Sequence, residues 1–105
     1  MKVYIAGPYT QGDVAVNVRQ AMMAGLEVMR YGHYPFIPHL FHFVHLVSPQ
    51  DYSTWIELDL EFLPTCDALL RLPGPSKGAD AEVIEARKLG MPVYASMAEF
   101  LEATA

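Results

Sequence analysis

Apolar residues form four short runs along the chain, and each run is followed by a stretch with helical spacing. The runs predict buried strands because they are short and are bounded by glycine, proline or polar residues. They cover residues 3–6, 34–37, 67–72 and 92–95.

The stretch after the first run predicts a long helix. Asp13 is a suitable N-cap for it, and Gly32 ends it. The apolar residues at helical spacing, which we expect to face the core, are Val18, Met22, Leu26 and Met29.

The middle of the chain predicts less regular structure. Residues 39–47 are apolar with three histidines and predict either a short helix or a half-buried lid. Ser48-Pro49 is typical of an N-cap and first helical position. The helix it would open carries apolar residues on one face: Tyr52, Ile56, Leu60 and Leu63.

Two further helices are expected near the C-terminus. One covers residues 81–89 and is closed by Gly90, and a short one follows the capping-box pattern Ser96-Met97-Ala98-Glu99. Regular alternation of strands and helices predicts a parallel sheet covered on both faces. We therefore expect a flavodoxin-like three-layer sandwich with four or five parallel strands in the order 2-1-3-4, and right-handed crossovers.

In that order, the topological switch point lies between strands one and three. The loops that leave these strands, residues 7–12 and 73–78, are the richest in glycine and proline. Ligands bind at the carboxyl ends of strands at such a switch point. The sequence therefore predicts one site in one crevice.

Composition narrows the functional classes. The 105 residues are enough for one domain, 1–105, and 52% are apolar. The net charge of -5 and the scattered lysines and arginines argue against nucleic-acid binding. One cysteine excludes an internal disulfide, and no apolar run reaches membrane-spanning length. We expect a cytoplasmic protein with no signal peptide and no membrane partner.

The loop at 73–78 leads directly into a helix whose expected first turn carries Asp80 and Glu82. Backbone N–H groups at a helix start attract anions, and the helix dipole favours charged carboxylates there. Glu82 is therefore a candidate nucleophile or base beside a phosphate or a sugar. The plain alternative is that acids are common in first turns simply to offset the dipole.

Asp59 is the second candidate. It lies at the edge of its helix's apolar stripe, where a carboxylate needs a partner or a function, although it can equally be a simple boundary residue. His39, His42 and His45 are spaced by three. Neighbouring pairs are able to share a metal, but a half-buried lid is favoured, and His39 is the best placed to reach a ligand.

Several other side chains are candidate binding groups. Ser76 and Lys77 are suited to anion binding, and Ser76 can equally be a helix N-cap. Tyr4 and Tyr9 flank the first loop and can either hydrogen-bond a carboxylate or serve in packing. No Gly-x-Gly-x-x-Gly or Walker pattern is present, which disfavours dinucleotide and nucleoside-triphosphate sites.

Motifs in a fixed order give the chain a family resemblance. They are Val3-Tyr4-Ile5-Ala6-Gly7-Pro8, Asp59-Leu60, Cys66-Asp67-Ala68, Ser76-x-Gly78-x-x-x-Glu82, Ala86 and Leu89-Gly90. With them, the chain resembles the nucleoside 2-deoxyribosyltransferases and the related nucleoside 5′-monophosphate N-glycosidases, closest to a small, poorly characterised branch. The resemblance runs over nearly the whole length.

The resemblance implies roles. Glu82 falls on the nucleophilic glutamate that attacks the anomeric carbon, and Asp59 on an aspartate that assists proton transfer. Ser76 falls where the glycosidases bind phosphate and the transferases contact the sugar, and Gly7 lies in the loop that lets the nucleotide approach the backbone. Gly78, in the motif that leads to Glu82, is a further candidate substrate-binding residue. The resemblance also implies homodimers or larger homo-oligomers. The glycosidases that prefer monophosphates carry an arginine in the first loop, whereas residues 8–12 of this chain contain none. Lys77 is the alternative phosphate partner.

Three functional hypotheses follow. The main one is cleavage or transfer at the N-glycosidic bond of a nucleoside or its 5′-monophosphate, with paired carboxylates and without a metal or organic cofactor. The first alternative is a non-catalytic nucleotide-binding module that uses the same crevice. The second is a metal protein based on His39, His42 and His45.

Overall fold

The computed structural model describes all of residues 1–105 and contains one sheet of four parallel strands. The strands are ordered β2-β1-β3-β4, as the alternation of elements predicts. Their bounds are β1 (Lys2–Ala6), β2 (Tyr34–Phe36), β3 (Ala68–Arg71) and β4 (Val93–Tyr94).

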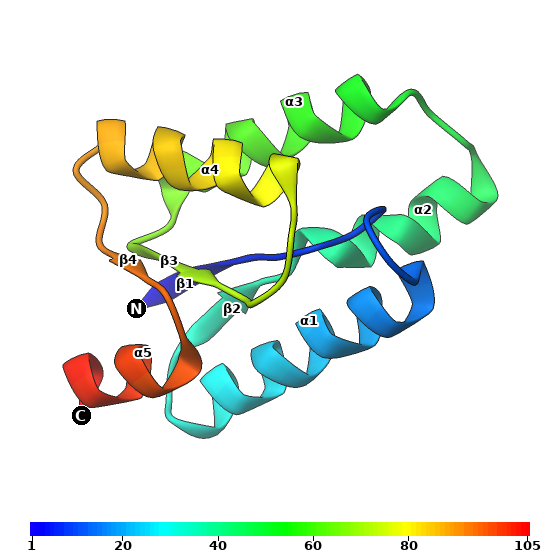
Figure 1. Cartoon of the computed structure of the whole chain (residues 1–105). Helices are drawn as coiled ribbons and strands as arrows, with labels where there is room; N and C mark the ends of the chain where they lie inside the picture. The colour runs from blue at the N-terminus through cyan, green and yellow to red at the C-terminus, as the bar shows by residue number, and fades with distance from the viewer.

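Helices cover both faces of the sheet, so the flavodoxin-like three-layer arrangement is confirmed (Figure 1). Helices α1 (Val14–Arg30) and α5 (Met97–Thr104) lie on one face, and α3 (Tyr52–Phe62) and α4 (Lys77–Lys88) lie on the other. The short helix α2 (Phe41–Val47) lies near the loop that follows β1. None of the helices combines the length and the apolar character that a membrane crossing requires.

Two short 3₁₀ helices complete the chain: η1 (Pro38–Leu40), between β2 and α2, and η2 (Leu63–Thr65), between α3 and β3.

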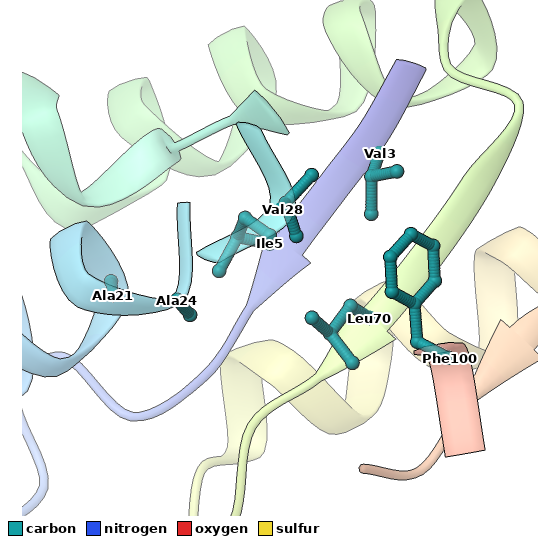
Figure 2. Packing of buried hydrophobic residues seen from close by; sticks show 7 residues of the cluster. All are labelled: Val3, Ile5, Ala21, Ala24, Val28, Leu70 and Phe100. Carbon is teal, nitrogen blue, oxygen red and sulfur yellow. The ribbon is translucent and has the colours of Figure 1, made fainter. Parts of the chain in front are cut away.

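The core divides into two clusters, one on each side of the sheet, because successive strand residues point to opposite faces. Figure 2 shows the cluster under α1 and α5, in which Val3, Ile5 and Leu70 pack against Phe100 and Val28.

The opposite cluster, under α3 and α4, is built around Tyr4, Ala6 and Leu69. Both β1 and β3 contribute to both clusters, which fixes the register of the two central strands. The carboxyl ends of these strands therefore lie at a defined position between the two helix layers.

Helix α1 begins and ends as predicted but buries a different face. Asp13 caps it by accepting a hydrogen bond from the Val16 N–H. Of the four residues expected in the core, only Val18 is buried; Met22, Leu26 and Met29 are exposed. The buried positions are instead small, because a Cβ at Gly25 would overlap the Cδ1 atom of Ile37. Close packing thus selected small residues over large apolar ones.

The predicted start of α3 at Ser48-Pro49 is wrong. Ser48 instead ends α2, where its N–H donates to the Val44 carbonyl, and α3 starts after Asp51. The predicted apolar face of α3 is also only partly correct: Leu63 is buried, whereas Tyr52 and Leu60 are exposed.

Helix α4 starts earlier than predicted, at Lys77. Glu82 therefore lies in the second turn rather than the first, and it is buried. The dipole effect is concentrated in the first turn, so it does less for this carboxylate than the sequence suggested. At α5, Ser96 caps the helix as predicted, and Glu99 reaches back to the Ala95 N–H.

Candidate functional site

A cavity of about 390 Å³ opens at the carboxyl ends of β1 and β3, at the predicted switch point. This volume is within the range of small-molecule sites, roughly 300–1,000 Å³. Its walls come from the β1–α1 loop, η1, α2, α3 and the start of α4. It is therefore assembled from segments far apart in the sequence.

The two loops at the switch point are joined to each other. The backbone N–H of Lys77 donates to the Gln11 side-chain oxygen at 2.9 Å. A Cβ at Gly7 would lie 3.0 Å from the Cβ of Leu72, so the residue at position 7 must be small for the loops to approach. The two loops that line this side of the cavity are thus held together by direct contacts.

Glu82 reaches the cavity from α4 and is only 8% exposed. The Tyr4 hydroxyl donates a hydrogen bond to its Oε2 atom. Burial raises the pKa of Glu82 to about 7, although the Tyr4 hydrogen bond and the Arg71 charge oppose this rise. The expectation that the helix dipole keeps this group charged is thus wrong, because desolvation dominates.

Asp59 enters the same cavity from α3. Its Oδ1 atom is buried without a hydrogen-bond partner. Burial, and next the charge of Glu82, raise the pKa of Asp59 to about 7. The two carboxyl groups therefore repel each other when both are charged, and near neutral pH they favour a state with one proton between them. One acid and one base at neutral pH suit general acid–base chemistry.

Ser76 combines the two roles that its position suggested. Its Oγ atom accepts from the Ala79 N–H at 3.1 Å, so it is the N-cap of α4, and it also lines the cavity. Since the cap uses the oxygen as an acceptor, the hydroxyl proton can still be donated to a ligand. The neighbouring Gly78 lies so near α3 that a Cβ there would be 2.5 Å from the Tyr52 hydroxyl.

The three histidines take different partners. The Nε2 atom of His39 lies 2.9 Å from the Pro8 carbonyl oxygen, so Nε2 carries the proton and donates. Its Nδ1 atom is buried without a partner, and burial lowers the pKa of His39. His42 contacts the Tyr9 hydroxyl and His45 the Trp55 indole. No three potential metal ligands gather anywhere in the structure, which disfavours the metal-protein hypothesis.

The cavity lining brings together most of the predicted site residues: Gly7, Tyr9, His39, Asp59, Ser76, Gly78 and Glu82. Tyr4 is the exception. It has no exposed surface and lies behind Glu82, so it orients that carboxylate rather than contacting a ligand. Its predicted ability to bond a carboxylate is seen, but with a carboxylate of the protein.

Sequence reasoning missed an aromatic wall made by Phe41, Tyr52 and Trp55. The rings of Phe41 and Trp55 are stacked, with centroids 6.0 Å apart and an interplanar angle of 19°. The spacing of Tyr52, Trp55 and Asp59 along α3 was an available signal, because such positions share one side of a helix. Tyr52 was instead assigned to the core stripe.

Comparisons with known proteins place the chain in a family and identify its fold. The profile of a domain family described as a domain of unknown function (DUF7768) matches residues 1–96. A search of curated proteins found no significant match. Among solved structures, the fold is similar to that of a 2-deoxyribosyltransferase from Bacillus psychrosaccharolyticus, with a TM-score of 0.63 and 20% sequence identity. The similarity covers 89% of this chain and 69% of the other.

Proposed function

This chain belongs to the DUF7768 family, a domain of unknown function, and we propose that it cleaves or transfers at an N-glycosidic bond. The substrate is a nucleoside or deoxynucleoside, or its 5′-monophosphate, bound by residues 1–105 acting as one deoxyribosyltransferase-like domain. The observation that carries the proposal is the pairing of Asp59 and Glu82, both with a pKa near 7, in one cavity.

In the first step, a Glu82 oxygen attacks the anomeric carbon while the bond from that carbon to the base nitrogen breaks. Protonated Asp59 gives its proton to the departing base, so the base leaves neutral and Asp59 becomes a carboxylate. In the second step, Asp59 takes a proton from water, which attacks the anomeric carbon and frees Glu82. When a second base attacks instead of water, the reaction is a transfer.

The surroundings of the two carboxyl groups support this assignment. The developing positive charge on the sugar lies beside the Glu82 carboxylate, and retaining glycosidases use paired carboxylates in this way. The Tyr4 hydroxyl orients Glu82 from behind, where no ligand reaches. The fold shared with a 2-deoxyribosyltransferase adds independent support.

The start of α4 is the part of the cavity suited to a sugar hydroxyl or a phosphate. Ser76 has a hydroxyl proton available, and Gly78 leaves the backbone accessible beside it. The first loop supplies Gly7 and Tyr9, and η1 supplies the unpartnered Nδ1 atom of His39, which can accept a hydrogen bond from a ligand hydroxyl.

The protein acts as a homo-oligomer in this proposal, because α1 presents an apolar outer face. We define this face by Met22, Met23, Leu26 and Met29, which are 39–60% exposed. Adjacent exposed apolar residues of this kind mark interaction surfaces. A second copy of the chain carries the same face and is therefore a suitable occupant.

The test is chromatographic detection of free base. Purified protein is incubated with ribonucleosides, deoxyribonucleosides and their 5′-monophosphates. Base release is expected from part of this panel and is expected to vanish in Glu82→Ala and Glu82→Gln. Glu85→Gln is the matched control, because it removes a carboxylate one turn further along α4 that does not line the cavity. Full activity in folded Glu82→Ala would overturn the proposal. Adding a second free base distinguishes transfer from hydrolysis.

A non-catalytic nucleotide-binding module is the second candidate, and the raised pKa of Glu82 favours it. A carboxyl group that holds its proton in about half of the molecules at neutral pH is a weaker nucleophile than one that is fully charged. This candidate predicts binding of a panel member by calorimetry without any product. It also predicts that Glu82→Gln leaves that binding intact.

A further inference from the structure

Two imidazoles attach the short helix α2 to the walls of the cavity. The Nδ1 atom of His42 lies 2.8 Å from the hydroxyl oxygen of Tyr9, in the β1–α1 loop. The Nδ1 atom of His45 lies 2.9 Å from the indole Nε1 atom of Trp55, on α3. Helix α2 is thus linked to two separate elements that line the same cavity.

The contact with Trp55 fixes the protonation of His45. An indole N–H can only donate, so the Nδ1 atom of His45 must be unprotonated to accept from it. The backbone N–H of Gln50 lies 3.2 Å from the same atom and also only donates. A proton on this nitrogen removes both hydrogen bonds and places three N–H groups against one another. The Tyr9–His42 contact is less demanding, because a hydroxyl can donate or accept.

Apart from these hydrogen bonds, α2 is held mainly at its first residue, Phe41, whose ring packs against Phe36 and Trp55. None of its seven residues is buried, and its outer face exposes Phe43, Val44, Leu46 and Val47. Opening such a segment costs little apolar burial, so its hydrogen bonds carry much of the local stability. The indole of Trp55 faces the cavity and stacks on Phe41 at the start of α2. His45 itself does not line the cavity.

We propose that His45 is a positioning residue, which holds Trp55 in the cavity wall and, together with His42, latches α2 as a lid that opens when His45 is protonated. The inference takes from the proposed function only that the cavity is the ligand site. A ligand in the closed cavity contacts the Trp55–Phe41 wall, so it stabilises the latched state and is held by it.

The charged surroundings allow this switch. Neither imidazole forms an ion pair with an acidic side chain. The titratable groups on the elements around α2 are Tyr9, His39, Asp51, Tyr52, Glu57, Asp59 and Glu61. With no paired carboxylate to hold a positive charge in the latched geometry, protonation favours release of His45 to solvent. Imidazole is the side chain that changes charge between about pH 5 and pH 8.

The chain offers a direct reporter, because Trp55 is its one tryptophan. The experiment measures the emission of Trp55 and its quenching by acrylamide in the ligand-free protein between about pH 8 and pH 5. Wild type is expected to become more readily quenched as the pH falls. His45→Asn keeps an acceptor near the position of Nδ1 without a titrating group, so it stays latched throughout. His45→Ala lacks the acceptor, so its open-to-closed ratio at the upper pH is expected to be roughly fivefold larger than that of wild type and to stay the same as the pH falls.

His33→Gln is the matched control, because it removes an imidazole that lies edge-on to Phe100, in the cluster under α1 and α5 on the other side of the sheet from α3. It is expected to titrate as wild type does. A titration in His45→Asn that equals that of wild type would overturn the inference. So would wild-type quenching in His45→Ala, with far-UV circular dichroism confirming that each variant is folded.

A kinetic comparison then links the latch to the site. With the best substrate of the nucleoside panel, His45→Ala is expected to raise KM roughly fivefold with kcat little changed, and His45→Asn to restore KM. The two proposals fail separately. A protein without turnover but with the expected fluorescence titration retains the latch and loses the glycosidase. A protein that turns over substrate but shows no such titration retains the proposed glycosidase activity and loses the latch.

Discussion

Glu82 is a buried carboxyl group, and at the residue scale its charge has a cost that stability measurements can detect. Its pKa is raised from 4.5 to about 7 in the folded state. Between these values the folded protein holds a proton that the unfolded chain releases, so stability is greatest at low pH and is lost as the pH rises through 7. Glu82→Gln removes the charge. It is expected to increase the free energy of unfolding by about 2 kcal/mol near pH 8 and by almost nothing near pH 4.

Thermal unfolding followed by calorimetry across this pH range measures the effect. Glu85→Gln is the matched control, since the pKa of Glu82 is raised first by burial and Glu85 is less buried. A difference between Glu82→Gln and wild type that does not change with pH would contradict the assigned cause.

The effect of Tyr4 on catalysis can be measured separately from any effect on substrate binding. Its hydroxyl donates to Glu82 and lowers the pKa of that carboxyl, so Tyr4→Phe is expected to raise this pKa further. Under the proposed function, the acid limb of the kcat profile moves to higher pH, and kcat falls roughly tenfold, the effect of one hydrogen bond to a charged group. KM stays unchanged, because the side chain is fully buried. A rise in KM without a shift of the pH profile would contradict the orienting role.

The candidate carboxylates could be found from sequence because each broke a local pattern. Asp59 sits at the edge of an apolar stripe, and Glu82 follows a glycine-rich loop after a buried strand. The raised pKa of Asp59 could be predicted from the sequence, but the raised pKa of Glu82 could not. The partly apolar setting of Asp59 was visible, whereas the burial of Glu82 depends on how α4 packs on the sheet, which no local pattern shows.

Ser76 and Ser96 allow a comparison at the scale of elements. Both are N-caps, of α4 and α5 respectively, with Oγ accepting a backbone N–H at 3.1 Å. Replacing either by alanine is expected to reduce the free energy of unfolding by about 1 kcal/mol. Only Ser76 lines the cavity, so only Ser76→Ala is expected to raise KM or weaken nucleotide binding. Denaturant unfolding and calorimetry measure the two effects, and equal ligand affinity in both variants would exclude a binding role.

The close approach of α3 and α4 gives a second prediction at this scale. A Cβ at Gly78 meets the Tyr52 hydroxyl at 2.5 Å but the ring carbon below it only at 3.8 Å. Gly78→Ala is therefore expected to destabilise wild type by about 1 kcal/mol or more through overpacking. In a Tyr52→Phe background the clash is gone, and the better helix propensity of alanine makes the same change neutral or stabilising.

A double-mutant cycle in urea measures this coupling. Equal effects of Gly78→Ala in both backgrounds would show that the helices separate instead of sharing that contact. The prediction does not depend on any activity, because it concerns only the distance between the two helices.

The existence of the elements was predictable, but their buried faces were not. Caps such as Asp13 and Ser96 are local signals, and both are confirmed. The face of α1 was misassigned because large apolar residues were taken as the core. In the structure the helix lies too close to Ile37 for anything but a glycine at position 25. That distance is set by the sheet, so it is not contained in the periodicity of the helix.

At the scale of the whole molecule, the strand order followed from general rules. Alternating strands and helices with right-handed crossovers leave few arrangements, and the order 2-1-3-4 is the one seen. That order also placed the cavity at the ends of β1 and β3. The aromatic wall could not be predicted in the same way, because it joins α2 and α3 through the rings of Phe41 and Trp55, a contact between side chains from separate helices.

The misassigned face of α1 leads to the last prediction. Met22, Met23, Leu26 and Met29 leave an apolar surface that the single chain does not cover. Self-association buries such a surface, and fully burying one leucine is worth roughly 1.5–3 kcal/mol. Leu26 is 60% exposed in the single chain, so a substitution there tests self-association directly. We expect the protein to form a homodimer or larger oligomer in light scattering, and Leu26→Lys to shift it to monomer without lowering the free energy of unfolding of the isolated chain.

Ile84→Lys is the matched control, because Ile84 is similarly exposed but lies on α4, on the opposite side of the sheet from α1. It is expected to leave the oligomer intact. A monomeric wild type would remove the oligomer from the proposed function while leaving the paired carboxyl groups untouched, since Asp59 and Glu82 meet within one chain. An oligomer that survives Leu26→Lys would instead direct attention to the exposed apolar residues of α2, where a second copy would also restrain the lid.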